Sequence, residues 1–75
     1  MTLEEFVNRF AEEFDDTPKE LFKAETRYRE LDEWSSLSGL SIISMVDDEF
    51  DKQITGSDLR KAETIKDLYE IIKNK

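Results

Sequence analysis

Two adjacent serines, Ser35 and Ser36, stand where a long irregular segment gives way to a helical pattern. The first N–H groups of a helix lack partners within the helix, and the helix dipole is positive there, so a phosphate group is favoured. A serine hydroxyl at this point can carry a phosphodiester, and it needs no base of its own if another enzyme forms the bond. Taken alone, Ser36 would more often be the N-cap of this helix than a modified residue.

The composition excludes most other chemistry. The 75 residues include no Cys and no His, which excludes a thiolate nucleophile, an imidazole base and an ordinary zinc site. Four acidic residues have calcium-loop spacing, but Lys52 stands where such a loop needs Gly, so we expect no metal site. These four are Asp47, Glu49, Asp51 and Asp58. A catalytic carboxylate pair needs a pocket that separates its pKa values, and we expect no enzyme in so thin a fold.

The charge balance points to protein partners. Eleven Lys and Arg residues against nineteen Asp and Glu residues give a net charge of −8. Such a chain repels nucleic acid and anionic lipid and favours partners with basic docking surfaces. The N-terminus is acidic, unlike a signal peptide, and no apolar run approaches the roughly 20 residues that span a bilayer. We therefore expect a cytoplasmic monomer with no membrane insertion.

Helical periodicity predicts the elements that position Ser36. A capping box at Thr2 and apolar residues at spacings of three and four predict a first helix over about residues 3–15. A second capping box at Thr17 and Pro18 predicts a short turn that buries Leu21 and Phe22. Residues 24–34 show no sustained period. We expect this loop to be pinned to the core by Tyr28, Leu31 and Trp34.

The second half of the chain predicts three further helices. From Ser36 to about Phe50, one helical face is marked by Leu37, Leu40, Ile43, Val46 and Phe50. Ser57 is the expected cap of a short helix over 58–61, and Thr64 precedes the last helix. The pattern favours an all-α fold: a small four-helix bundle with three longer helices, one short helix and a long first loop, in a single domain over residues 1–75.

The segment around Ser36 resembles the acyl carrier protein family. That family has Asp-Ser-Leu at the start of its second helix, then apolar residues at helical spacing, then an acidic run ending in Phe. This chain has Ser35-Ser36-Leu37, then Leu40, Ile43 and Val46, and then Asp47-Asp48-Glu49-Phe50. The acidic first helix, the loop ending in Leu31 and the final helix with Asp67-Leu68 extend the resemblance over the whole chain.

The resemblance implies that Ser36 carries 4′-phosphopantetheine, whose thiol holds acyl groups as thioesters. With Ser36 in this role, Ser35 is the expected N-cap of the helix. A phosphopantetheinyl transferase would attach this arm. Acyl-loading, condensing and acyl-transfer enzymes would then use the cargo. The expected docking residues are Leu37, Asp47, Asp48 and Glu49. The resemblance also implies that the acyl chain shelters between helices, in a cleft lined by residues such as Leu40, Ile43 and Ile71.

Departures from the family pattern leave alternatives open. Ser35 replaces the usual Asp, and Ser41 and Ser44 stand where an acidic and a bulky apolar residue are common. These differences suggest a specialised lipid or polyketide-type pathway rather than housekeeping fatty-acid synthesis. A peptidyl or aminoacyl carrier, or an unmodified acidic helical interaction module, is the alternative function. The sequence also leaves open whether Leu37 and Met45 lie in the core or face partners.

Overall fold

The computed structural model describes residues 1–75, which form four α-helices and no strand. The helices are α1 (Leu3–Ala11), α2 (Ser36–Phe50), α3 (Gly56–Lys61) and α4 (Ile65–Lys73). Two short 3₁₀ turns, Lys19–Leu21 and Tyr28–Glu30, interrupt the long connection between α1 and α2. The all-α class, the single short helix and the long first loop are therefore confirmed.

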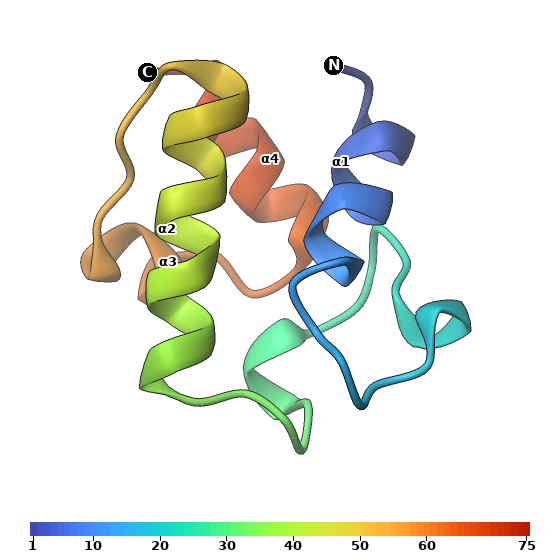
Figure 1. The fold of residues 1–75 in the computed structure, drawn as a ribbon. Helices are drawn as coiled ribbons and strands as arrows, with labels where there is room; N and C mark the ends of the chain where they lie inside the picture. Colours follow the sequence, from blue (N-terminus) through green and yellow to red (C-terminus); the bar gives the residue numbers. More distant parts are fainter.

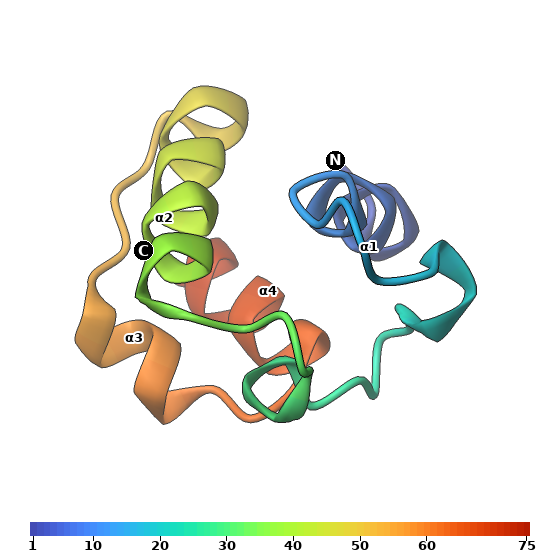
Figure 2. The same ribbon diagram turned by 60° about the horizontal axis from the view of Figure 1, so that its bottom comes forward.

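The helices surround one hydrophobic core. In both ribbon views α4 lies between α1 and the α2–α3 pair, while the long first connection wraps from the end of α1 to the start of α2 (Figure 1, Figure 2). The core contains 17 buried residues drawn from every α-helix and from the first connection. No helix of the structure combines the length and the apolar character needed to span a membrane.

Helix α1 begins as predicted but ends earlier. Thr2 Oγ1 accepts from Glu5 N–H and Glu5 Oε1 accepts from Thr2 N–H, a reciprocal pair that satisfies two free donors. The α-helix ends at Ala11, so the predicted extension to residue 15 is wrong. The next turn has i→i+3 bonds, including Phe14 N–H to Ala11 O at 3.1 Å. Because such a turn preserves a spacing of three, Phe14 stays buried and continues the apolar pattern.

The first connection is held by the carboxylate of Glu33. It accepts from the backbone N–H of Asp15 at 3.1 Å, from that of Asp16 at 3.2 Å and from the Thr17 hydroxyl at 2.6 Å. The predicted capping box at Thr17 is therefore wrong, because its hydroxyl bonds a distant carboxylate and Pro18 precedes a 3₁₀ turn with no side-chain cap. Phe22 is buried as predicted, whereas Leu21 is 54% exposed.

We predict that Glu33→Gln lowers the Tm by a few degrees at neutral pH, because the amide cannot reproduce all three bonds to the charged carboxylate. The Thr17 hydroxyl, followed by the backbone amides, holds the pKa of Glu33 below its ordinary value of 4.5. The folded chain therefore binds fewer protons than the unfolded chain at this group. Its contribution is complete above about pH 4.5 and is lost as the pH falls through the lowered folded pKa.

Thermal melts from pH 7 to pH 3 check this prediction. The difference in Tm between the wild type and Glu33→Gln should shrink on acidification, because protonation removes the charge of Glu33 in the wild type, and the glutamine variant never carries that charge. Glu20→Gln is the matched control, because Glu20 is exposed and makes no hydrogen bond through its side chain. A Glu33→Gln difference that stays constant across this range would contradict the role of the charged carboxylate.

Tyr28 ties the first connection to α3. Its ring is fully buried, and its hydroxyl donates to Leu59 O at 2.6 Å, with Ala62 O at 3.2 Å. Burial raises the pKa of this phenol to about 12, so it remains a donor at any physiological pH. Leu31 and Trp34 are half-buried against the same core. The predicted anchoring of the loop by these three residues is confirmed.

The buried face of α2 differs from the predicted one. Gly39, Ile42, Met45 and Val46 are buried, whereas Leu37 is 74% and Leu40 is 60% exposed. The two faces are hard to distinguish by sequence because both carry apolar residues at helical spacing. Met45 is therefore a core residue, at 2% exposure, and Leu37 faces solvent. The helix ends at Phe50 as predicted, with Asp51 in the left-handed conformation at φ 54°.

The starts of the last two helices show how capping boxes operate. Thr55, not Ser57, caps α3: Thr55 Oγ1 accepts from Asp58 N–H while Asp58 Oδ2 accepts from Thr55 N–H. The predicted Ser57 cap is wrong because Arg60, three residues later, cannot return the bond. Thr64 and Asp67 form the equivalent pair on α4, so the predicted start of the last helix is confirmed.

Candidate functional site

Aromatic packing fixes the junction between the first connection and α2. The ring of Trp34 lies 5.1 Å from that of Tyr28 and 6.3 Å from that of Phe14, measured between ring centroids. Trp34 therefore packs against buried rings from both ends of the first connection, just after α1 and just before α2. Since Ser35 and Ser36 follow directly, this packing holds the two serines at a defined point on the surface.

Of the two serines at this junction, one caps the helix and the other is exposed without a hydrogen bond. Ser35 is the N-cap, and its Oγ accepts from Ser38 N–H at 3.4 Å. The Ser38 hydroxyl in turn donates to Glu33 O at 3.1 Å. The Ser36 hydroxyl takes no part in this network, and Ser36 is exposed on the first turn of the 15-residue helix. The predicted Ser35 cap is confirmed, and the Ser36 hydroxyl has no hydrogen-bond partner in the protein.

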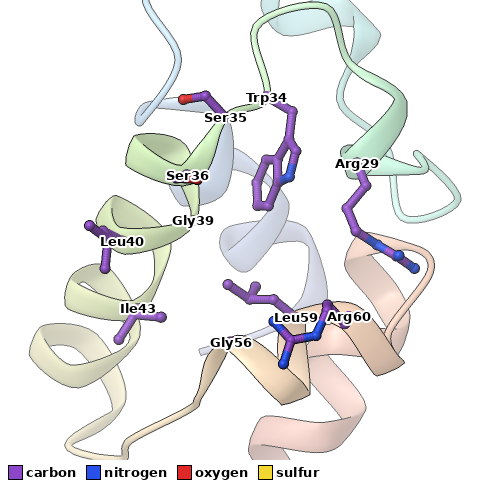
Figure 3. A pocket seen from close by; sticks show the side chains of 10 residues that line it. All are labelled: Arg29, Trp34, Ser35, Ser36, Gly39, Leu40, Ile43, Gly56, Leu59 and Arg60. Carbon is purple, nitrogen blue, oxygen red and sulfur yellow. The ribbon is translucent and has the colours of Figure 1, made fainter.

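A pocket of about 520 Å³ opens beside Ser36, between α2 and α3. Figure 3 shows Ser36 on the first turn of α2, Leu40 and Ile43 further along it, and Arg60 across the pocket on α3. Apolar side chains form much of the wall: Trp34, Leu40, Ile43 and Leu59. The predicted cleft residues Leu40 and Ile43 therefore do lie together. Ile71 does not line this pocket and instead packs against the core.

The charges around this pocket differ from those of the whole chain. Its lining includes Arg29 and Arg60 but no Asp or Glu, although the chain has a net charge of −8. The first turn of α2 also carries no acidic residue. A phosphate group on Ser36 would therefore meet the positive end of a helix dipole with no acidic side chain in that turn to oppose it.

Gly39 forms part of the pocket floor. An added Cβ would lie 3.5 Å from Leu59 Cδ1 and 3.8 Å from Trp34 Cζ2, which are ordinary contacts. No glycine in the chain has a positive φ, so alanine fits the backbone. We predict that Gly39→Ala stabilises the unmodified protein by about 1 kcal/mol, because alanine has the higher helix propensity. The Tm should rise by about 4–8 °C in thermal melts.

Gly56→Ala is the comparison for this prediction. Gly56 is the first residue of α3, where helix propensity matters less, and its added Cβ would lie 3.4 Å from Arg60 Nη1. We expect little change in Tm for this variant. A lower Tm for Gly39→Ala would contradict the prediction, since it would mean that Leu59 and Trp34 cannot accommodate a methyl group.

The predicted docking residues all lie on α2, and the structure separates their environments. Leu37 is exposed beside the site, and Asp47 and Asp48 are exposed near the far end of the helix without an ion pair. Glu49 differs, because its Oε2 lies 3.2 Å from Arg9 Nε of α1. The charge of Glu49 is therefore partly neutralised within the molecule, and the unpaired acidic surface of this run is that of Asp47 and Asp48.

Sequence reasoning missed the α3 side of the pocket. Leu59, Gly56 and Arg60 come from α3, and Arg29 comes from the first connection. No local pattern marks these residues, because they reach Ser36 only when α3 packs beside α2. A spacing rule cannot detect such a contact. No signal in the sequence marks this contact; in the structure, the Tyr28 hydroxyl holds α3 to the first connection by donating to Leu59 O.

Comparisons with known proteins identified no relative of this chain. No protein-family model matches this chain, and searches of curated proteins and of solved structures found no match.

Proposed function

We propose that this chain is an acyl carrier protein, a non-catalytic shuttle that holds acyl groups as thioesters on a 4′-phosphopantetheine arm at Ser36. One observation carries the proposal: the Ser36 hydroxyl is exposed and outside the capping network, at the start of α2 and beside an apolar-walled pocket. The resemblance of Ser35-Ser36-Leu37 and of the following acidic run to the family motif adds to it.

The chemistry of the chain fits a modified carrier. A protein without Cys has no thiol of its own, and the arm would supply one. A phosphopantetheinyl transferase would form the bond between the Ser36 oxygen and the phosphate, with release of the nucleotide part of coenzyme A. The tether then raises the effective concentration of the acyl group at each partner's active site.

The surface of α2 is the proposed docking face. Leu37 and Leu40 expose apolar side chains, and Asp47 and Asp48 provide unpaired negative charge on the same helix. Loading, condensing and transfer enzymes with an apolar contact and basic side chains would fit this combination. Ser35 and Ser41 stand where acidic residues are usual in the family, so this face is less acidic, which favours a specialised lipid or polyketide-type pathway.

Intact mass spectrometry tests the carrier function. The unmodified protein is incubated with coenzyme A and a broad-specificity phosphopantetheinyl transferase. The expected result is a mass gain of one phosphopantetheine unit, located on the peptide that contains Ser36. If the transferase modifies a reference carrier but not this chain, the carrier proposal is wrong. The unmodified interaction module, which would use the exposed leucines and aspartates of α2, would then be the better hypothesis.

A further inference from the structure

Glu33 makes hydrogen bonds unlike those of the other carboxylates in the chain. Four acidic side chains accept from backbone N–H groups, and they are those of Glu5, Glu33, Asp58 and Asp67. Three of them bond residues within four positions of their own and cap the helix on which they stand. The donors to Glu33 instead lie 16–18 positions earlier in the chain, so its carboxylate joins two distant segments.

One of these segments, residues 15–17, is itself fixed in place. It directly follows Phe14, whose N–H bonds Ala11 O at the end of α1 and whose ring is buried. Pro18 follows the segment with φ at −57°, and a proline also restricts the backbone of the residue before it. Residues 15–17 therefore present their donors to Glu33 from a stiff stretch of chain.

The other segment is the start of α2. The backbone oxygen of Glu33 accepts from the Ser38 hydroxyl, in the first turn of this helix, at 3.1 Å. Ser36 lies between these two residues in the chain, and its own side chain makes no hydrogen bond. The position of the Ser36 hydroxyl is therefore set by its neighbours. Glu33 connects them to the end of α1 by hydrogen bonds, and Trp34 does so by ring packing.

We propose that Glu33 is a positioning residue for the modification of Ser36. This inference rests on the proposed carrier function. By holding residues 15–17 against the start of α2, the Glu33 carboxylate keeps the Ser36 hydroxyl in the orientation that a phosphopantetheinyl transferase accepts. In the transfer, the Ser36 oxygen bonds the phosphorus of the arm and the bond from this phosphorus to the nucleotide part of coenzyme A breaks. The hydroxyl proton passes to a base of the transferase.

The bonds to Glu33 act on the population of the competent arrangement. Three further acidic residues line the hollow beside Glu33, and they are Asp16, Glu30 and Asp32. Their mutual repulsion favours opening of the junction once the bonds to Glu33 are lost. The transferase then binds only the fraction of molecules in which Ser36 is correctly placed, so the KM for the carrier rises. Chemistry in the bound complex is unchanged, so kcat stays the same.

Transferase kinetics test this inference, with the carrier concentration varied at a temperature well below every melting transition. We expect Glu33→Gln and Thr17→Val each to raise the KM for the carrier about 3–10-fold with kcat unchanged. Thr17→Val removes the hydroxyl that donates to Glu33 at 2.6 Å. The double variant should have about the same KM as Glu33→Gln alone, because both changes break the same contact.

Trp34, the one tryptophan of the chain, reports on the junction without the transferase. In Glu33→Gln its fluorescence should shift to longer wavelength as the ring gains exposure, while far-UV circular dichroism shows the same helix content. Glu5→Gln is the matched control, because it also alters a carboxylate that accepts from a backbone N–H. That carboxylate lies at the start of α1, at the opposite end of the molecule from the start of α2 (Figure 1). This variant should melt lower with KM and Trp34 emission unchanged.

The outcomes separate this inference from the carrier function. An unchanged KM in Glu33→Gln, with the wild type fully loaded, would overturn the inference and leave the carrier function standing. A KM raised in Glu33→Gln but not in Thr17→Val would also overturn it, because the transferase would then contact Glu33 directly. An equal rise in Glu5→Gln would do the same, since any loss of stability would then have this effect. If the wild type takes up no arm, the carrier function fails and this inference fails with it.

Discussion

Ser36→Ala is expected to abolish attachment of the phosphopantetheine arm completely, whereas the wild type gains one unit per chain. The reason is chemical, since alanine has no oxygen to bond the phosphorus atom. Folding should be nearly unchanged, because the Ser36 hydroxyl is exposed and makes no bond within the protein. Intact mass after incubation with coenzyme A and the transferase measures attachment, and a thermal melt of each variant measures folding.

Two neighbouring serines are the matched controls. Ser44→Ala removes an exposed hydroxyl from the same helix and should load fully. Ser35→Ala removes the N-cap, whose loss costs about 1 kcal/mol, so it should melt lower and still load. Full loading of Ser36→Ala would place the attachment elsewhere and refute the proposed role of this residue. Loss of loading in Ser44→Ala as well would indicate that the transferase reads this face of α2.

Met45→Ala is expected to destabilise the protein strongly, by about 2–5 kcal/mol, because Met45 is 2% exposed and its removal leaves a cavity in the core. For a chain of 75 residues the total stability is expected to be about 4–11 kcal/mol, so this single change removes a large share of it. Urea denaturation of the unmodified protein measures the loss of unfolding free energy.

Leu40→Ala, on the other face of α2, is the control for this prediction. Leu40 is 60% exposed, so its truncation should change stability by less than about 0.5 kcal/mol. The same variant should weaken docking if Leu40 contacts partners, which a transferase assay at limiting carrier concentration would detect. If instead Leu40→Ala destabilised the protein as much as Met45→Ala, α2 would be packed through the face that the leucine pattern predicts.

The sequence predicted where the helices lie better than it predicted how they pack. Capping boxes operate within four residues of the chain, so Thr2 and Thr64 identified helix starts from local spacing alone. Ser35 was expected as the N-cap of α2 for another reason, because the family resemblance assigns the neighbouring Ser36 to the arm. Local spacing failed at Ser57. Thr55 and Ser57 are both possible caps of α3, but only Thr55 is followed three residues later by an acidic residue, Asp58, that accepts a hydrogen bond in return.

The candidate site was predictable only on its α2 side. Ser36, Leu40 and Ile43 were expected at one site because their segment resembles the family motif, and all three line the pocket. The roles of Leu37 and Met45 stayed open because α2 is apolar on more than one face. Only packing against the other helices decided that Met45 is buried and Leu37 is exposed.

The sequence by itself therefore determined the all-α class and the approximate positions of the four helices, because each depends on residues close together in the chain. The tertiary structure alone decided which face of α2 enters the core and which charges surround Ser36. Arg29 and Arg60 lie far apart in the chain and line one pocket only because the buried Tyr28 hydroxyl bonds Leu59 O and so fixes the first connection against α3. Long-range contacts of this kind leave no spacing signature in a single sequence.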